Sequence, residues 1–128
     1  EPSGKVFGND RILSATSIFG KSVGASLDTT LTTDILTCPS DKVLKVKSVI
    51  VANIDGTNDA AVTVYFYDNS ATARYALAST VNVPADASLV VLGQDSPLYL
   101  EESDQIEAGA SAASDLQIVI SYEELDDA

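Results

Sequence analysis

The sequence predicts an all-β protein, an antiparallel β-sandwich of jelly-roll type with about eight strands. Apolar and polar residues alternate with a period of two in several segments, which places successive side chains on opposite faces of a pleated strand. From Asp34 onward, clusters of Gly, Pro, Asn, Asp and Ser interrupt the chain about every 8–12 residues, the spacing typical of sandwiches and barrels. No segment has a convincing helical period. Another Greek-key sandwich is the second choice.

The length of 128 residues suits one domain, and a hydrophobic content of 45% argues against disorder. Residues 1–34 are the least regular part, with four glycines and many Ser and Thr residues. We expect an extended N-terminal arm there, or a strand added to the body or to a neighbouring subunit. A poorly ordered terminus is the alternative, because termini fray unless they are tied down. The β-sandwich domain is expected to span residues 35–128.

The clearest strand signal lies between Val43 and Asp68, where two alternating runs flank a turn-rich segment at residues 54–59. This pattern predicts a β-hairpin with one core face and one outer face. The residues expected on the core face are Leu44, Val46, Ile50, Ala52, Val62, Val64 and Phe66. The residues expected on the outer face are Lys45, Lys47, Thr63, Tyr65 and Tyr67.

The remaining strands follow from shorter patterns between turn signals. Turns are predicted at residues 39–41, 68–72, 84–87 and 93–97, with a polar corner at 101–104 and a small-residue loop at 109–114. The expected strands are 35–38, 73–83, 88–92, 98–100, 105–108 and 116–122, with a short β segment within 27–33.

Charge is distributed unevenly along the chain, whose net charge is −12. All seven Lys and Arg residues precede residue 75, whereas residues 75–128 carry eleven acids and no base. So acidic a surface repels phosphate backbones, and we expect no nucleic-acid partner. No apolar run approaches the roughly 20 residues that span a bilayer, and we expect no membrane association.

The side chains offer little for catalysis or metal binding. The chain has one cysteine, Cys38, and no histidine, so the usual base for thiol or serine catalysis and the commonest transition-metal ligand are both missing. Two acidic groups, residues 55–59 and 101–104, could suggest calcium, but neither has the spacing of a calcium loop. A turn and a solvated corner explain them. We therefore expect no enzyme activity, no catalytic residue, no cofactor and no metal site.

Two sets of residues are candidates for protein contacts. The outer face of the predicted hairpin combines Lys45 and Lys47 with Tyr65 and Tyr67, and aromatic residues on a polar strand face can anchor an interface or stack against sugars. The arm contributes the second set, which comprises Ile12, Ile18 and Phe19.

The segment from Thr37 to Glu124 resembles a family of small β-sandwich virion proteins from tailed bacteriophages. The resemblance rests on the order of five phrases. They are T-C-P-S-D-K-V-L-K-V-K-S-V-I-V-A-N-I-D-G-T, V-T-V-Y-F-Y-D, L-A-S-T-V-N-V-P-A-D-A-S-L-V-V-L, P-L-Y-L-E-E-S-D-Q-I-E-A and L-Q-I-V-I-S-Y-E-E. Members of this family resemble decoration (cement), neck or tail-associated components, and they act by assembly and not by catalysis.

The resemblance implies a bacteriophage virion structural protein. Our first expectation is a capsid decoration (cement) protein that stabilises the assembled shell through contacts with the major capsid protein or other virion proteins. Such a protein would be a homo-oligomer, a trimer or dimer, located in the virion after assembly in the host cytoplasm. The alternatives are a neck or tail/fibre-associated virion protein, or a carbohydrate- or receptor-binding β-sandwich module.

Overall fold

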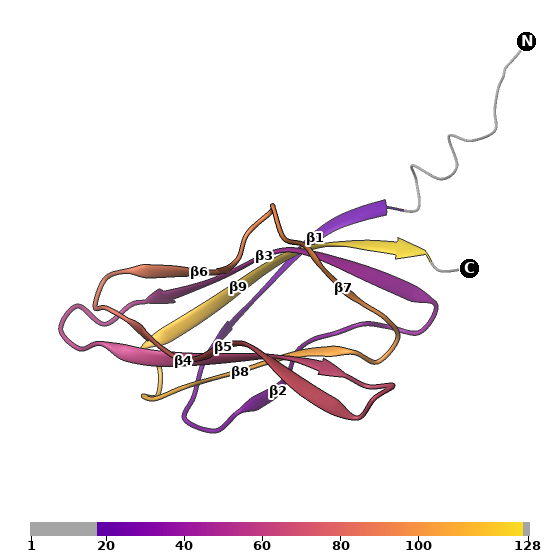
Figure 1. Ribbon diagram of the computed structural model, residues 1–128. Coiled ribbons are helices and arrows are strands. Elements are labelled where there is room, and N and C mark those ends of the chain that lie inside the picture. Colours follow the sequence, from indigo (N-terminus) through magenta and orange to yellow (C-terminus); the bar gives the residue numbers. More distant parts are fainter. Residues whose placement is uncertain (1–17, 127–128) are drawn as a thin grey trace, which may run out of the picture.

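The computed structural model describes residues 18–126, and these residues form nine β-strands and no helix (Figure 1). The strands are β1 (Ile18–Ser26), β2 (Thr32–Thr37), β3 (Lys42–Asn53), β4 (Ala60–Asp68), β5 (Ala73–Val83), β6 (Ser88–Leu92), β7 (Leu98–Leu100), β8 (Gln105–Ala110) and β9 (Leu116–Asp126). The all-β prediction is therefore confirmed. No helix among the described residues is long and apolar enough to cross a membrane.

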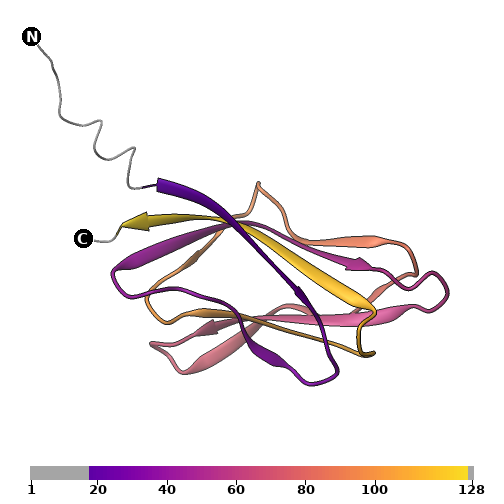
Figure 2. The ribbon, with the colours of Figure 1, turned by 180° about the vertical axis from the view of Figure 1, so that it is seen from behind.

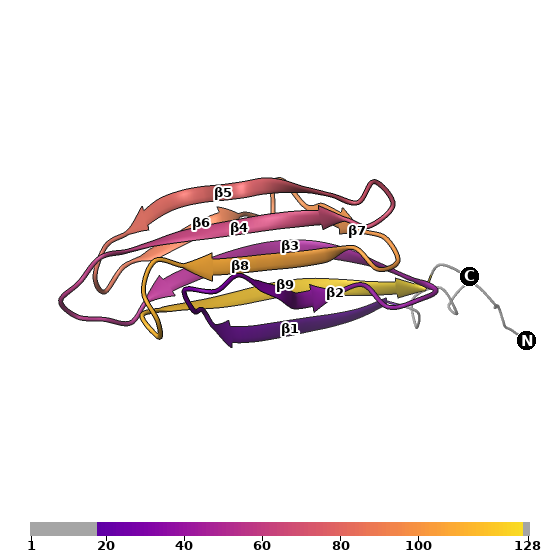
Figure 3. The same ribbon diagram turned by 90° about the horizontal axis from the view of Figure 1, so that it is seen from below.

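The strands form two antiparallel sheets packed face to face. Sheet A has the order β1-β9-β3-β6, with β7 also paired to β3, and sheet B has the order β2-β8-β4-β5. Strands of the two sheets run in broadly the same direction, as in aligned sandwiches (Figure 3). The chain repeatedly crosses from one sheet to the other, and this order is that of a jelly roll.

The core lies between the sheets and is built mainly from Val, Leu and Ile, which suit half-buried strands. Along β3, β4 and β9 its fully buried members alternate with exposed or half-buried residues. The side chains with a relative exposure of 0% are Val46, Val49, Val51, Val62, Val64, Val83, Leu100, Ile106, Ala108, Leu116, Ile118 and Ile120. These residues belong to one continuous core cluster.

The predicted hairpin between Val43 and Asp68 is wrong. β3 pairs with β9, β6 and β7 in sheet A, whereas β4 pairs with β5 and β8 in sheet B. The turn-rich segment is a crossover between the two sheets. It is fixed by the buried Asn53 side chain, which donates to the carbonyl oxygens of Asn58 and Val83 at 3.0 Å and accepts the Asp55 N–H at 2.9 Å. Turn residues and flanking alternation are common to hairpins and to such crossovers.

The predicted core face of β3 is correct only for its first half. Leu44 and Val46 are buried as expected, but Ile50 is 37% exposed, and Val49 and Val51 occupy the core. The cause is a β-bulge, because the pairing with β9 shifts between Val46 and Ser48. One extra residue exchanges the two faces of a strand from that point on. Ala52, paired with Gln117 on the outer side, is displaced from the core face for the same reason.

The first part of the chain contributes to both sheets as far as the structure describes it. β1 lies along β9 at the edge of sheet A, where Ile18 is opposite Leu125 and Ser26 is opposite Gln117 (Figure 2). Leu27 is buried in the core. β2, which begins before residue 34 and continues beyond it, pairs with β8. Within the segment 1–34, residues 18–26 and 32–34 are therefore strand residues of the sandwich.

Candidate interaction surfaces

The two pairs of the predicted docking surface lie on opposite sides of the molecule. Lys45 and Lys47 belong to β3 of sheet A, and Tyr65 and Tyr67 belong to β4 of sheet B (Figure 1). Each pair alternates with core residues and lies on the outer side of its own sheet. The expectation that the four residues share one face is wrong, since it depended on the hairpin.

The lysines of β3 lie among residues from neighbouring strands. Lys45 is in register with Glu123 of β9 on one side and with Tyr99 of β7 on the other. The Lys47 Nζ lies 3.6 Å from Glu123 Oε2, and both side chains are partly exposed. Exposed pairs of this kind contribute little to stability, so these side chains remain available for contacts with another molecule.

Tyr65 and Tyr67 flank an arginine on the outer side of sheet B. The guanidinium carbon of Arg74 lies 5.8 Å from the Tyr65 ring centroid and 5.7 Å from the Tyr67 centroid. Arg74 Nε also donates to Glu107 Oε1 at 2.8 Å, which raises the pKa of Arg74 above its ordinary value. The Glu107 side chain is only 2% exposed, whereas that of Arg74 is 47% exposed. No local pattern indicates this ion pair, because its partners are 33 residues apart in the sequence.

A shallow hollow of about 340 Å³ lies beside Tyr65 on sheet B. Its lining residues are Thr29, Leu31, Ala61, Thr63, Tyr65, Thr80, Gly109, Ala110 and Ser111. Gly109 allows the 28–31 loop to approach, because a Cβ there would be 3.4 Å from Leu31 Cα. Ser111 Oγ accepts the Ala61 N–H and Thr63 Oγ1 accepts the Thr80 N–H, so both hydroxyl protons can be donated to a ligand.

In each of the two acidic groups, an aspartate accepts hydrogen bonds from backbone N–H groups. Asp55 accepts from Thr57 and Asn58 in the crossover, and these hydrogen bonds lower the pKa of its carboxyl group. Asp104 is buried and accepts the N–H groups of Asn69 and Glu101, both at 2.9 Å. Among residues 18–126, no group of three Asp, Glu, Cys or His residues is arranged to hold a metal ion.

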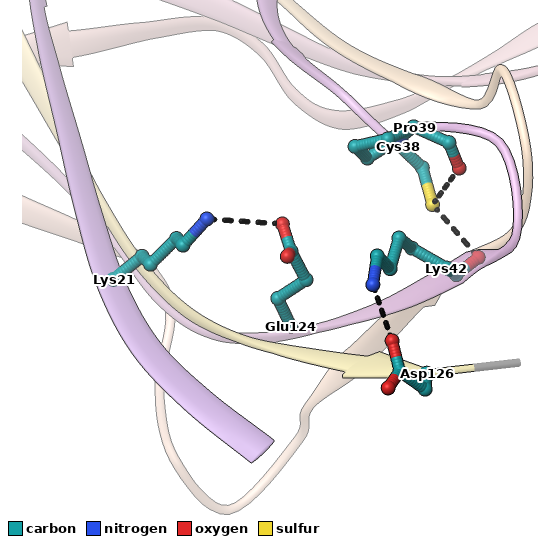
Figure 4. Close-up of polar contacts among 6 residues, drawn as sticks. All are labelled: Lys21, Cys38, Pro39, Lys42, Glu124 and Asp126. Carbon is teal, nitrogen blue, oxygen red and sulfur yellow. Dashed lines mark hydrogen bonds and ion pairs between the residues drawn. The ribbon is translucent and has the colours of Figure 1, made fainter. Parts of the chain in front are cut away.

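One end of the sandwich carries cross-strand ion pairs and the only cysteine (Figure 4). Lys21 of β1 pairs with Glu124 of β9 at 3.2 Å, and Lys42 of β3 pairs with Asp126 of β9. The pair with Asp126 raises the pKa of Lys42. Cys38 is buried, its thiol is placed to donate to the Lys42 carbonyl oxygen at 3.2 Å, and burial raises its pKa. A buried thiol with a raised pKa is a poor nucleophile.

The outer side of sheet A carries a row of exposed apolar residues that the sequence pattern does not predict. Val119 of β9, Ile50 of β3 and Val90 of β6 are in register on three neighbouring strands and are 48%, 37% and 61% exposed. Gly24 of β1 continues the row opposite Val119. The bulge in β3 concealed this row, because it moves Ile50 from the core side to the outer side.

The arm residues proposed for contacts are only partly described. Ile18 and Phe19 begin β1 and are 47% and 50% exposed, opposite Leu125 and Glu124 of β9. Ile12 lies outside the described residues. The two described residues form an apolar end to the edge strand of sheet A.

Comparison with known proteins supports a fold and no sequence family. No protein-family model matches the chain, and no curated protein matches it in sequence. Among solved structures, a chain from disulfide-linked pili, the endospore appendages of Bacillus, is similar with a TM-score of 0.52 and 17% identity, covering 88% of this chain and 90% of that chain. A chain from the acid-stable capsid of the Helicobacter pylori bacteriophage KHP30 is similar with a TM-score of 0.51 and 10% identity, covering 87% and 89%. This chain therefore shares the β-sandwich fold of both.

Proposed function

We propose that the protein is a structural component of a bacteriophage virion and, within that class, a capsid decoration protein that binds the assembled shell. The observation that carries this proposal is the similarity to a chain of a phage capsid structure over nearly the full length of both chains. The ordered sequence phrases between Thr37 and Glu124 point to the same class of protein. In this role the chain has no catalytic task.

The physical character of the chain agrees with such a role. A decoration protein that binds only the assembled shell stabilises that shell by mass action. The exposed apolar row on the outer side of sheet A can supply such contacts. They would be made to the major capsid protein or another virion protein, and between copies in a homo-oligomer.

The similarity to a chain of the Bacillus endospore appendages concerns pili that are disulfide-linked. The single cysteine of this sequence is 2% exposed in the core, so a link of that kind through Cys38 would require the sandwich to open. We therefore favour assembly of this chain through noncovalent contacts.

The decisive experiment is cryo-electron microscopy of intact particles from the phage that encodes the chain, compared with particles that lack its gene. We expect difference density repeated over the outer surface of the shell. Density restricted to the neck or tail would instead support a neck or tail/fibre-associated virion protein. Identical maps, together with absence of the chain from purified particles by mass spectrometry, would overturn both.

A second candidate function is carbohydrate or receptor binding at the hollow beside Tyr65. An aromatic wall beside hydroxyl donors from Thr63 and Ser111 suits a sugar ring. A glycan-binding screen would test this role, with Tyr65→Ala as the variant and Tyr75→Ala, an exposed tyrosine outside the lining, as the matched control. Binding that is lost in Tyr65→Ala and kept in Tyr75→Ala would support it, and no binding by the parent protein would remove it.

A further inference from the structure

The exposed row on sheet A has unequal ends. Val90 is 61% exposed and projects from β6, whereas the β1 end of the row is Gly24, which has no side chain. An open hollow of about 300 Å³ lies at this end, lined by residues 24–26 and 117–119. Ile50 and Val119 occupy the two middle positions. The row thus has a projection at one end and a recess at the other.

We propose that two copies of this chain pair face to face through the outer side of sheet A. The two-fold axis would run parallel to the strands, midway between β3 and β9. Under that operation Val90 of each copy lies over the partner copy's recess at Gly24, and Ile50 lies over Val119. Every position of the four-residue row then has a counterpart, as an isologous interface requires.

A second row is complementary under the same axis. Gly20, Glu123, Lys45 and Tyr99 are in register across β1, β9, β3 and β7. The same rotation places Tyr99, which is 52% exposed, over a glycine with no atom within 4 Å of its Cβ position. It also places Lys45 over Glu123. One choice of axis therefore matches side-chain size in both rows and charge in the second row.

The charge of the chain also favours this face for self-association. Two copies with a net charge of −12 each repel one another, so contact is easiest where carboxylates are few. The paired outer positions around the apolar row are small or uncharged. They are Ser22, Ser121 and Ser48 on one side of it, and Ser26, Gln117, Ala52 and Ser88 on the other.

These observations favour a second copy of the chain as the partner of this face, because one two-fold rotation makes both rows complementary to themselves. This inference does not rest on the virion role. The pairing is measured on the purified chain without any particle, so its failure and that of the proposed function can be told apart.

The first test compares two identical substitutions in light scattering coupled to size-exclusion chromatography and in sedimentation equilibrium, over concentrations up to about 1 mM. We expect the parent chain to form dimers. Ile50→Lys, at the centre of the face, should weaken dimerisation at least about tenfold, because it buries two unpaired charges. The matched control is Ile54→Lys, an exposed position in the crossover, which should dimerise like the parent.

The second test exchanges size between the two ends of the row. Gly24→Val fits the single chain, since the nearest atoms to a Cβ there are at 3.7 and 3.9 Å, but it fills the recess and should weaken the dimer. Val90→Ala in the same chain should restore it. These positions are three strand spacings apart, about 14 Å, so neither can relieve the other within one copy. Ala76→Val, on the edge strand of sheet B, is the control for added bulk.

A monomeric parent chain over the whole concentration range would overturn the proposal. So would Ile50→Lys dimerising as tightly as the parent, or a double variant no better than Gly24→Val alone. Circular dichroism and melting temperature check that each variant is folded. Should Ile50→Lys unfold, Val90→Lys at the exposed end of the row replaces it with the same expected loss.

Discussion

Arg74 covers Glu107 on the outer side of sheet B, with Arg74 Nε 2.8 Å from Glu107 Oε1. The carboxylate is almost completely buried, while about half of the arginine side chain faces solvent. Such a pair contributes less through attraction than through the penalty that it prevents, because an unpaired buried carboxylate is costly.

Arg74→Met should therefore lower the free energy of unfolding, because the buried Glu107 carboxylate is left without its partner. Urea unfolding measures this loss. Adding Glu107→Gln to Arg74→Met should recover part of it, since the buried group is then neutral. An Arg74→Met variant as stable as the parent would contradict this view of the pair.

Asp104 is expected to be among the most sensitive polar positions of the loops. Its carboxylate binds the backbone of two separate turns, so Asp104→Ala leaves the N–H groups of Asn69 and Glu101 without their acceptor. We expect a loss of about 3 kcal/mol in thermal or urea unfolding. Asp104→Asn keeps the shape and one acceptor oxygen and should cost less. Equal losses for the two variants would contradict this prediction, because the acceptor oxygen that Asn keeps would then contribute nothing.

The bulge in β3 makes a direct prediction for two adjacent residues. Val49→Ala should destabilise the protein by about 2 kcal/mol, because it removes methyl groups from the closed core. Ile50→Ala should cost less than about 1 kcal/mol, since Ile50 lies on the outer side. Urea unfolding at low micromolar concentration, where a dimer would dissociate, provides the comparison. A larger loss for Ile50→Ala than for Val49→Ala would indicate that Ile50 lies in the core, as the sequence predicts.

Asp55 should make part of the stability dependent on acidic pH. Its pKa is lowered in the folded chain by N–H donors from Thr57 and Asn58 and by the Asn58 side chain, so the unfolded chain binds the proton more readily. The stabilisation is present above the ordinary carboxyl pKa and is lost as pH falls through the lower folded pKa. The difference in free energy of unfolding between the parent and Asp55→Ala should therefore shrink below about pH 4. A difference constant across that range would contradict the assignment.

Much of the strand content could be predicted because it depends on local rules. The alternation in residues 73–83 and 116–122 and the turn residues between strands gave nearly all of the described strands. The short segment expected within 27–33 overlaps β2 only at Thr32 and Thr33, and the sequence indicates no definite strand at β1. Its Gly- and Ser-rich sequence has no strong alternation, and it becomes a strand by pairing with β9.

The candidate surfaces were harder to predict because they combine residues from distant strands. The alternation predicts that each of four side chains lies on an outer face: Lys45, Lys47, Tyr65 and Tyr67. Which of them share a face depends on the sheet to which each strand belongs. The Arg74–Glu107 pair was not found for the same reason.

The sequence by itself determined that this is an acidic all-β sandwich chain with one cysteine and no histidine, because composition and period-two alternation are local properties. Only the tertiary structure decided that β3 and β4 lie in different sheets and that the bulge beyond Val46 turns Ile50 outward. Strand pairing is set by the packing of the whole core, and a one-residue bulge leaves almost no trace in an apolar run such as Val49–Val51.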